Sequence, residues 1–139
     1  MDHALRAVLL PPVKPMPSLP APEAPSLSIL TYNILADAYL RPEWYAQVAP
    51  ALLEPGPRQA ALLARLEAAD ADVLCLQEVE PGVYQALHAH LQTLGYRGYF
   101  LRKGRQRADG CATFIRWQKA PVQATIALRY ADRGHRDQD

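Results

Sequence analysis

The sequence predicts a mixed α/β fold, and three of its features lead to that expectation. Segments rich in β-branched and aromatic residues alternate with segments whose leucines recur at helical spacing. Residues 73–79 are apolar on both faces up to Gln77, as in a central strand that is covered on both sides. Proline, glycine and aspartate separate these segments. The expected order of elements is β, α, β, α, β, β, β, without an internal repeat.

The first three elements of this order follow a proline-rich stretch. Residues 27–35 are expected to form a strand, and residues 37–57 an irregular stretch with a short helix near Trp44 and Tyr45. A long helix is expected over 58–69, because a proline before it suits a first helical turn and its apolar residues share one face. That face comprises Leu62, Leu63, Leu66 and Ala69.

The next elements begin after Asp70, which ends the first helix. A strand over 73–79 precedes a helix over 83–94, and Gly95 is suited to end that helix. The buried face of the second helix is expected to comprise Tyr84, Leu87, Leu91 and Leu94, and to leave His88 and His90 on the solvated surface. Three further strands are expected, over 96–101, 111–117 and 122–128.

Two regions divide the chain. Residues 1–26 contain seven prolines, which lack an amide hydrogen and fix φ, so this stretch is expected to be an extended, disordered arm or linker. A proline-rich ligand for a partner domain is the alternative. Residues 27–139 are expected to form a folded domain, although their mostly charged end, 132–139, closes no element.

Composition excludes some classes of protein. The formal net charge of +1 provides no global attraction for a polyanion, so any nucleic-acid contact must come from a local patch. No apolar stretch approaches the roughly 20 residues that cross a bilayer, and the N-terminal apolar run is too short for a signal peptide. Cys75 and Cys111 lie in apolar runs and are expected to be buried free thiols, with a disulfide or metal pair as the alternative. A cytoplasmic protein is therefore expected.

Two polar residues lie where the predicted strands end. Glu78 follows an apolar run, and Asn33 occupies the comparable place in the first strand. Ligand sites of open α/β sheets gather at strand ends, so the two side chains could meet at one rim and hold a hard cation such as Mg²⁺. In the alternative, Glu78 caps the turn at Pro81 and Asn33 satisfies a loop backbone. The residues alone leave both interpretations open.

A basic loop between Arg97 and Asp109 is a further candidate site. Its five cations are Arg97, Arg102, Lys103, Arg105 and Arg107, with no acidic residue among them. Such a loop can bind phosphate oxygens through charge-assisted hydrogen bonds. A merely solvated loop is the alternative. An Asp-Gly pair, Asp109 and Gly110, then turns the chain into the next strand.

Four segments together resemble a known family. Thr31-Tyr32-Asn33-Ile34-Leu35-Ala36-Asp37 resembles the opening motif of the endonuclease/exonuclease/phosphatase superfamily, within the branch of deadenylases, nocturnin, angel proteins and 2′-phosphodiesterase. The other three segments, in family order, are Leu76-Gln77-Glu78-Val79, Leu94 to Phe100 followed by Lys103, and Asp109-Gly110-Cys111-Ala112. Arg58 also matches an arginine common in this branch. The resemblance covers about residues 27–130.

The resemblance implies a fold, a cofactor and site residues. The implied fold is a four-layer α/β sandwich, with two mixed sheets face to face and helices outside, of which this chain would supply about half. Glu78 would be the Mg²⁺ ligand, with Mn²⁺ as a substitute, and Asn33 would orient the scissile phosphate or metal-bound water. Lys103, Arg102 and Asp109 would form the substrate-binding lip of the site.

The resemblance also implies an activity and shows what is missing. A mid-domain histidine, an Asp-x-Asn motif and a closing Ser-Asp-His motif of the family are absent from this sequence. We therefore expect an incomplete, Mg²⁺-dependent phosphodiesterase or nuclease domain acting on RNA 3′ ends or nucleotide phosphodiesters, inactive alone. Its exposed sheet predicts self-association or complementation by a second half. The alternatives are a non-catalytic phosphate- or RNA-binding module, and a phosphatase or sphingomyelinase of the same fold.

Overall fold

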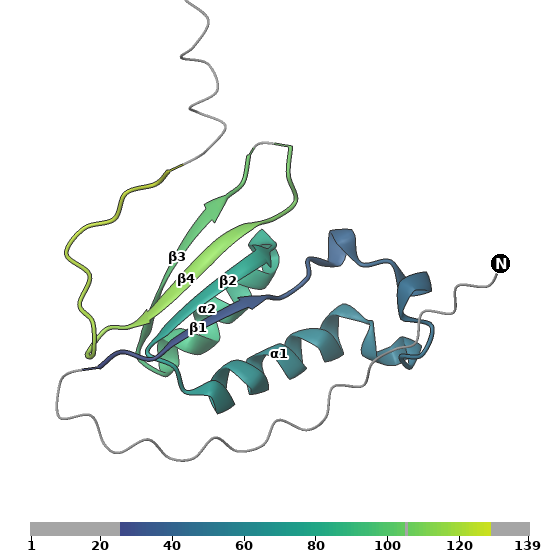
Figure 1. Cartoon of the computed structure of the whole chain (residues 1–139), viewed down its shortest axis with the longest axis horizontal. Helices are drawn as coiled ribbons and strands as arrows, with labels where there is room; N and C mark the ends of the chain where they lie inside the picture. The colour runs from purple at the N-terminus through teal and green to yellow at the C-terminus, as the bar shows by residue number, and fades with distance from the viewer. Residues whose placement is uncertain (1–25, 105, 129–139) are drawn as a thin grey trace, which may run out of the picture.

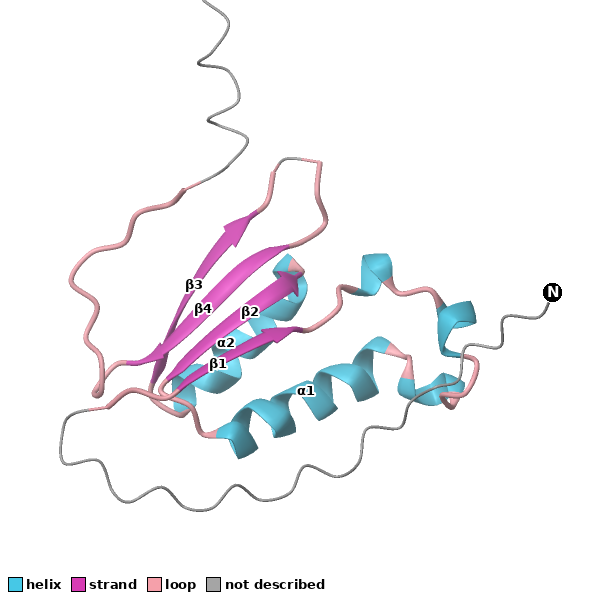
Figure 2. Cartoon of the chain, in the orientation of Figure 1, coloured by secondary structure: helices cyan, strands magenta, loops and turns pink. Residues whose placement is uncertain are grey.

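The computed structural model describes residues 26–104 and 106–128 and contains one mixed sheet with two helices. Residues 1–25, which are most of the predicted arm, and residues 129–139, which include the charged end, lie outside the described residues. Figure 1 shows the elements in space and Figure 2 their types. They are β1 (Ile29–Asn33), α1 (Pro55–Ala69), β2 (Val73–Val79), α2 (Pro81–Thr93), β3 (Tyr96–Arg102) and β4 (Gly110–Arg116).

The four strands lie in the order β1-β2-β4-β3. β1 and β2 are parallel, and β4 is antiparallel to both β2 and β3. The C-terminal ends of β1, β2 and β3 and the start of β4 therefore lie at the same edge of the sheet. Three short 3₁₀ turns connect β1 to α1, namely η1 (Asp37–Tyr39), η2 (Pro42–Tyr45) and η3 (Pro50–Leu52).

The core lies between one face of the sheet and both helices. Alternate residues of the strands face it, because successive side chains of a strand point to opposite sides. Phe114 of β4 is fully buried, and the Tyr84 ring of α2 stacks on both Phe100 and Phe114. The other fully buried core side chains come from both helices and from β2, namely Leu66, Leu74, Leu76, Val79, Leu87 and Leu91.

The predicted elements agree with this structure in most places. β2 has the predicted bounds, and α1 begins three residues earlier than predicted, at Pro55. The ends of both helices follow the predicted signals, since Asp70 adopts φ 44° after α1 and Gly95 adopts φ 84° after α2. The short helix expected near Trp44 is η2.

Three predictions are wrong. Residues 122–128 form no strand: they lie along the helix-free face of β3 and β4, with which they line a shallow hollow, and no ladder pairs them. Leu94 is 43% exposed, because α2 ends at Thr93 and the chain has already turned away from the core. Cys111 is exposed rather than buried, since it points to the helix-free face, where Cys75 is half-buried. Both thiols are free, as predicted.

Candidate active site

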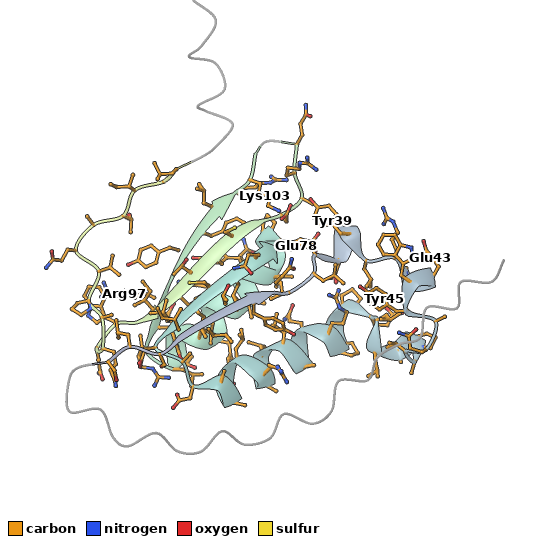
Figure 3. The ribbon with its side chains drawn as sticks, viewed as in Figure 1. Tyr39, Glu43, Tyr45, Glu78, Arg97 and Lys103 are labelled. Carbon is orange, nitrogen blue, oxygen red and sulfur yellow. The ribbon has the colours of Figure 1, made fainter. Side chains whose placement is uncertain are left out.

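The candidate site lies at the sheet edge where the parallel strands end. Asn33 ends β1, Glu78 is the penultimate residue of β2, and Asp109 immediately precedes β4. Lys103 follows the last residue of β3, which pairs with Gly110. The topology thus brings all the predicted site residues to one edge, and Figure 3 shows Glu78, Tyr39 and Lys103 near one another there.

Glu78 occupies a β-bulge. The pairing of β2 with β4 shifts between Gln77 and Val79, which leaves Glu78 out of the regular register. Its backbone adopts φ 58°, in the left-handed region that non-glycine residues rarely occupy. A bulge redirects a side chain and is common beside functional sites, and a left-handed residue costs about 1–3 kcal/mol. The local backbone therefore bears strain at the residue that presents the carboxylate.

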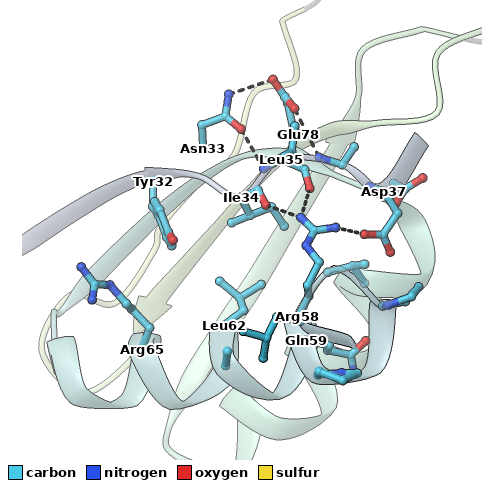
Figure 4. A pocket seen from close by; sticks show the side chains of 17 residues that line it. Tyr32, Asn33, Ile34, Leu35, Asp37, Arg58, Gln59, Leu62, Arg65 and Glu78 are labelled. Atoms are coloured by element: carbon cyan, nitrogen blue, oxygen red, sulfur yellow. Dashed lines mark hydrogen bonds and ion pairs between the residues drawn. The ribbon is translucent and has the colours of Figure 1, made fainter. Parts of the chain in front are cut away.

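Asn33 and Glu78 are in direct contact. The Asn33 Nδ2 donates a hydrogen bond of 2.8 Å to the Glu78 Oε1, as Figure 4 shows. The Asn33 Oδ1 accepts one of 2.9 Å from the backbone N–H of Leu35, which fixes the orientation of the amide. The predicted meeting of the two side chains is confirmed. The alternative for Asn33, that it satisfies a loop backbone, is also correct, because its Nδ2 bonds Glu78 while its Oδ1 bonds the backbone of Leu35.

The segment after β1 wraps around the Glu78 carboxylate. The backbone N–H of Ala36 donates a hydrogen bond of 3.2 Å to the Glu78 Oε2. Arg58 of α1 holds this segment from below: its guanidinium forms an ion pair with Asp37 and donates hydrogen bonds of 3.2 and 2.7 Å to the carbonyls of Ile34 and Leu35. Figure 4 shows these bonds converging under the loop. Arg58 thus orders the backbone that surrounds the carboxylate.

A cavity of about 490 Å³ lies between this loop and α1. Its walls combine apolar and charged side chains, including Tyr32, Leu62, Arg65, Glu78 and Glu80. The Glu80 carboxylate is engaged, because its Oε2 accepts a hydrogen bond of 2.9 Å from the backbone N–H of Asp37. The cavity therefore reaches Glu78 from the helix side of the sheet.

Asp109 is fully buried and has two side-chain partners. The Tyr39 hydroxyl donates a hydrogen bond of 2.6 Å to its Oδ1, and the Lys103 ammonium lies 2.7 Å from its Oδ2. Burial alone would raise the pKa of Asp109, but hydrogen bonds from Lys103 and Tyr39 outweigh it and hold this pKa below its usual range. The hydrogen bond to Asp109 is also the main reason that the pKa values of Tyr39 and Lys103 are raised.

Gly110 explains how Asp109 comes so close to β3. A Cβ built on Gly110 would lie 2.3 Å from the backbone oxygen of Leu101 and 2.7 Å from the Cα of Arg102. Only a residue without a side chain permits this approach of the two strands. The Asp-Gly pair therefore does more than turn the chain, as it seats the Asp109 carboxylate beside Lys103.

The basic loop keeps exposed cations at the same edge. Arg102 and Arg107 are exposed, and the Arg102 Nε donates a hydrogen bond of 2.7 Å to the carbonyl of Arg107. Lys103 is 48% exposed at its side chain although its ammonium contacts Asp109. Arg97, counted with this loop in the sequence, lies at the opposite end of β3, where its guanidinium packs 3.3 Å from the centre of the Trp117 ring. It takes no part in the site.

The donor set of Glu78 suits a magnesium ion. Each carboxylate oxygen accepts one hydrogen bond, which leaves lone pairs on both oxygens for a cation. Mg²⁺ keeps several water ligands and needs only one or two protein carboxylates. Within residues 26–104 and 106–128, no group of three or more His, Cys, Asp or Glu side chains is arranged to hold a metal. The Glu78 carboxylate therefore fits a role as one ligand of such an ion.

Sequence comparison identifies the family. The profile of the Endonuclease/Exonuclease/phosphatase family matches residues 30–139. The chain belongs to this family. Carbon catabolite repressor protein 4 homolog 4 of Arabidopsis thaliana is 34% identical over 106 residues, which are 75% of this chain and 25% of that protein. Protein angel homolog 2 of Danio rerio is 31% identical over 110 residues, or 77% and 19% of the two chains.

Solved structures of the same family share the fold. A crystal structure of ANGEL2, a 2′,3′-cyclic phosphatase, in complex with adenosine-2′,3′-vanadate superposes with a TM-score of 0.59 at 32% identity, over 64% of this chain and 27% of that one. The human Nocturnin catalytic domain with bound sulfate gives a TM-score of 0.51 at 29% identity, over 66% and 32%. The family member described here therefore has the α/β fold that the resemblance implied, as a partial domain.

The matched region is short compared with the relatives. The chain spans about a quarter of the length of Carbon catabolite repressor protein 4 homolog 4 and less of the angel homolog. None of the helices in the described part of the chain is long and apolar enough to cross a membrane.

Two groups at the site, the Tyr39 hydroxyl and the Ala36 N–H, were not predicted from the sequence. Tyr39 lies in a stretch that was expected to be irregular, and no spacing linked it to Asp109, 70 residues later. The backbone N–H of Ala36 carries no signal in a sequence at all. Both become visible only when the loop after β1 is folded back over the sheet edge.

Proposed function

We propose that this chain supplies part of the active site of a Mg²⁺-dependent phosphodiester hydrolase that acts on RNA 3′ ends or nucleotide phosphodiesters. The proposal rests on the contact between Asn33 and Glu78, whose Nδ2 and Oε1 atoms are 2.8 Å apart. Glu78 occupies a strained bulge where β2 ends. Membership of the family supports hydrolase chemistry. One related protein, of Schizosaccharomyces pombe, is a CCR4-Not complex 3′-5′-exoribonuclease subunit, which supports an RNA substrate.

Each site residue has a proposed role. Glu78 would hold Mg²⁺, or Mn²⁺ in its place, which when bound acts as a Lewis acid toward a phosphoryl oxygen. Asn33 and the Ala36 N–H fix the Glu78 carboxylate, so that its free lone pairs point in a set direction. Lys103 and the exposed Arg102 would bind substrate phosphate through charge-assisted hydrogen bonds. Both cysteines are free, in agreement with our proposal that the protein works in the cytoplasm.

We propose further that the site is completed by residues outside the described part. The helix-free face of the sheet carries the half-buried side chains of Cys75, Thr113 and Ile115. Residues 122–128 line a shallow hollow with β3 and β4 but leave Ile126 and Leu128 largely exposed. A second sheet, from a longer chain, a second copy or a separate protein, would cover this face and bring further catalytic groups to the edge. Alone, the chain would then be inactive.

A second candidate is hydrolysis of a terminal 2′,3′-cyclic phosphate. ANGEL2, one of the structural relatives, is a 2′,3′-cyclic phosphatase. Both reactions attack phosphorus in a nucleic-acid end, so the same carboxylate and cations would serve either. The alternative of a non-catalytic binding module predicts RNA binding without turnover.

The test compares two substrates and three proteins. The substrates are fluorescent oligoadenylate with a free 3′ end and the same RNA with a 2′,3′-cyclic phosphate. Each is incubated with Mg²⁺ and one of three proteins: the wild-type full chain, the Glu78→Gln variant or the Glu43→Gln variant. Glu43 is an exposed acid of η2 and is the matched control. Turnover that Glu78→Gln abolishes and Glu43→Gln preserves supports hydrolysis, and shows that the chain assembles a working site.

If the chain shows no turnover, a second measurement tests whether Glu78 binds the metal. Paramagnetic broadening of the Asn33 side-chain amide by Mn²⁺, followed by NMR, reports metal at Glu78 without catalysis. Broadening that persists in Glu78→Gln would contradict the proposed ligand.

A further inference from the structure

We propose that Asp109 is a positioning residue: its buried carboxylate holds the Tyr39 hydroxyl and the Lys103 ammonium and thereby keeps the loop around Glu78 in place. This role replaces the direct contact with substrate that the sequence suggested for Asp109. Its consequence for catalysis rests on the proposed hydrolysis, whereas its structural part does not.

The Asp109 carboxylate is buried and has two partners. Asp109 is 0% exposed, and a carboxylate removed from water is costly unless charged or hydrogen-bonding partners replace the water. Tyr39 and Lys103 supply them, one to each oxygen, at 2.6 and 2.7 Å. The Asp109 Oδ1 accepts the Tyr39 hydrogen bond and its Oδ2 is in ion-pair contact with Lys103, so in this structure the buried carboxylate presents no exposed oxygen to a substrate. Its effect on the site must pass through the groups it holds.

The path from Asp109 to Glu78 is short and continuous. Tyr39, held by Asp109, ends η1, and its backbone N–H donates a hydrogen bond of 2.9 Å to the carbonyl of Ala36. The N–H of the same Ala36 donates to the Glu78 Oε2 at 3.2 Å. One 3₁₀ turn is therefore tied to the two carboxylates at its opposite ends. A turn of this kind has little freedom to move one end without the other.

The second branch runs through the β3–β4 hairpin. The Lys103 backbone N–H donates a hydrogen bond of 3.1 Å to the carbonyl of Asp109, and its ammonium returns to the side chain of the same residue. The hairpin thus cannot shift along the sheet edge without carrying Asp109, and with it Tyr39. The loop after β1 and the basic loop, which are far apart in sequence, are fastened at one buried charge.

Electrostatics separates this role from phosphate binding. Lys103 and Asp109 together carry no net charge, so Asp109→Asn would leave the edge more positive. Ground-state attraction for an RNA phosphate should then hold or increase. A displaced Ala36 N–H, in contrast, would misdirect Glu78, and a shift of about 1 Å in a reacting group can reduce turnover 10²-fold. The inference predicts a loss in kcat without a rise in KM.

The experiment uses Asp109→Asn and the milder Tyr39→Phe in the full chain. Tyr45→Phe, on η2, is the matched control. Both test variants should shift the Ala36 amide resonance in ¹⁵N NMR spectra, and Tyr45→Phe should not. If the wild-type chain turns over oligoadenylate, kcat should fall about tenfold in both test variants, with KM unchanged or lower. The double variant Tyr39→Phe/Asp109→Asn should then lose no more activity than Asp109→Asn alone.

The outcomes separate this inference from the proposed function. Mn²⁺ broadening of the Asn33 amide that persists in Glu78→Gln would count against the proposed function, and the Ala36 resonance would still decide the role of Asp109. Absence of RNA hydrolysis by the wild-type chain is the outcome expected of an incomplete site and leaves this NMR test unaffected. An Ala36 resonance unmoved in folded Tyr39→Phe and Asp109→Asn proteins would overturn the inference. Equal losses in Tyr45→Phe, or a raised KM at constant kcat, would overturn it too.

Discussion

Replacing Glu78 by glycine and by alanine should reveal the strain stored at the bulge. Both substitutions remove the carboxylate and its two hydrogen bonds, so their difference depends on the backbone alone. At an ordinary strand position, a protein with glycine is less stable than the same protein with alanine by about 0.5–1 kcal/mol. The reason is that glycine gives the unfolded chain more conformations. At φ 58° the order should reverse, since alanine retains the strain of the left-handed region and glycine does not.

The size of the difference follows from two opposing contributions. Left-handed backbone costs a residue with a Cβ about 1–2 kcal/mol, and the extra entropy of unfolded glycine opposes about 0.5–1 kcal/mol of this. The Glu78→Gly protein should therefore be more stable than the Glu78→Ala protein by up to about 1.5 kcal/mol, with a central value of about 0.7 kcal/mol. Urea unfolding followed by circular dichroism measures this as a difference in midpoint at constant m value.

A matched pair at Cys75 provides the control. Cys75 lies in the same strand, in regular register opposite Thr113, and its φ is not positive. There, Cys75→Ala should be more stable than Cys75→Gly. If alanine is also the more stable replacement at Glu78, the bulge stores no strain, and our explanation of how this carboxylate is presented is wrong.

Three other substitutions test the rest of the structure. Phe114→Ala removes the fully buried ring on which Tyr84 stacks and should lower the free energy of unfolding by about 3–5 kcal/mol, measured by urea unfolding. Gly110→Ala forces a methyl group against the Leu101 carbonyl and should destabilise by about 1–3 kcal/mol, with a change in the Lys103 amide resonance; an unchanged melting temperature would refute the close approach. Hydrogen bonds from the backbone and hydroxyl of Ser28 lower the pKa of Asp72, so its stabilising contribution is present above the unfolded pKa of about 3.9 and is lost as pH falls through the lower folded value. Ser28→Ala should therefore flatten the acid limb of a pH–stability curve, and an unaltered limb would contradict this.

The sequence predicted the fold well where one local signal was sufficient. Residues 73–79 are apolar on both faces and bounded by turn residues, and β2 has those bounds. Both helices were found because their leucines recur on one face and because Asp70 and Gly95 end them. Residues 122–128 were misjudged for the opposite reason. Alternation of side chains favours a strand, but a strand also requires a partner edge, and none pairs this segment in the described structure.

The same distinction between local signals and distant contacts applies to the candidate site. The sequence itself determined that Asn33 and Glu78 lie at or next to the ends of two strands, because the end of an apolar run can be recognised locally. Tertiary structure alone decided that their side chains touch, that Glu78 sits on a bulge with positive φ, and that Asp109 is buried against Tyr39 and Lys103. The physical reason is range: apolar periodicity and turn chemistry act between near neighbours in the chain. Strand register, a bulge and a buried ion pair depend on atoms that meet only after distant segments have packed together.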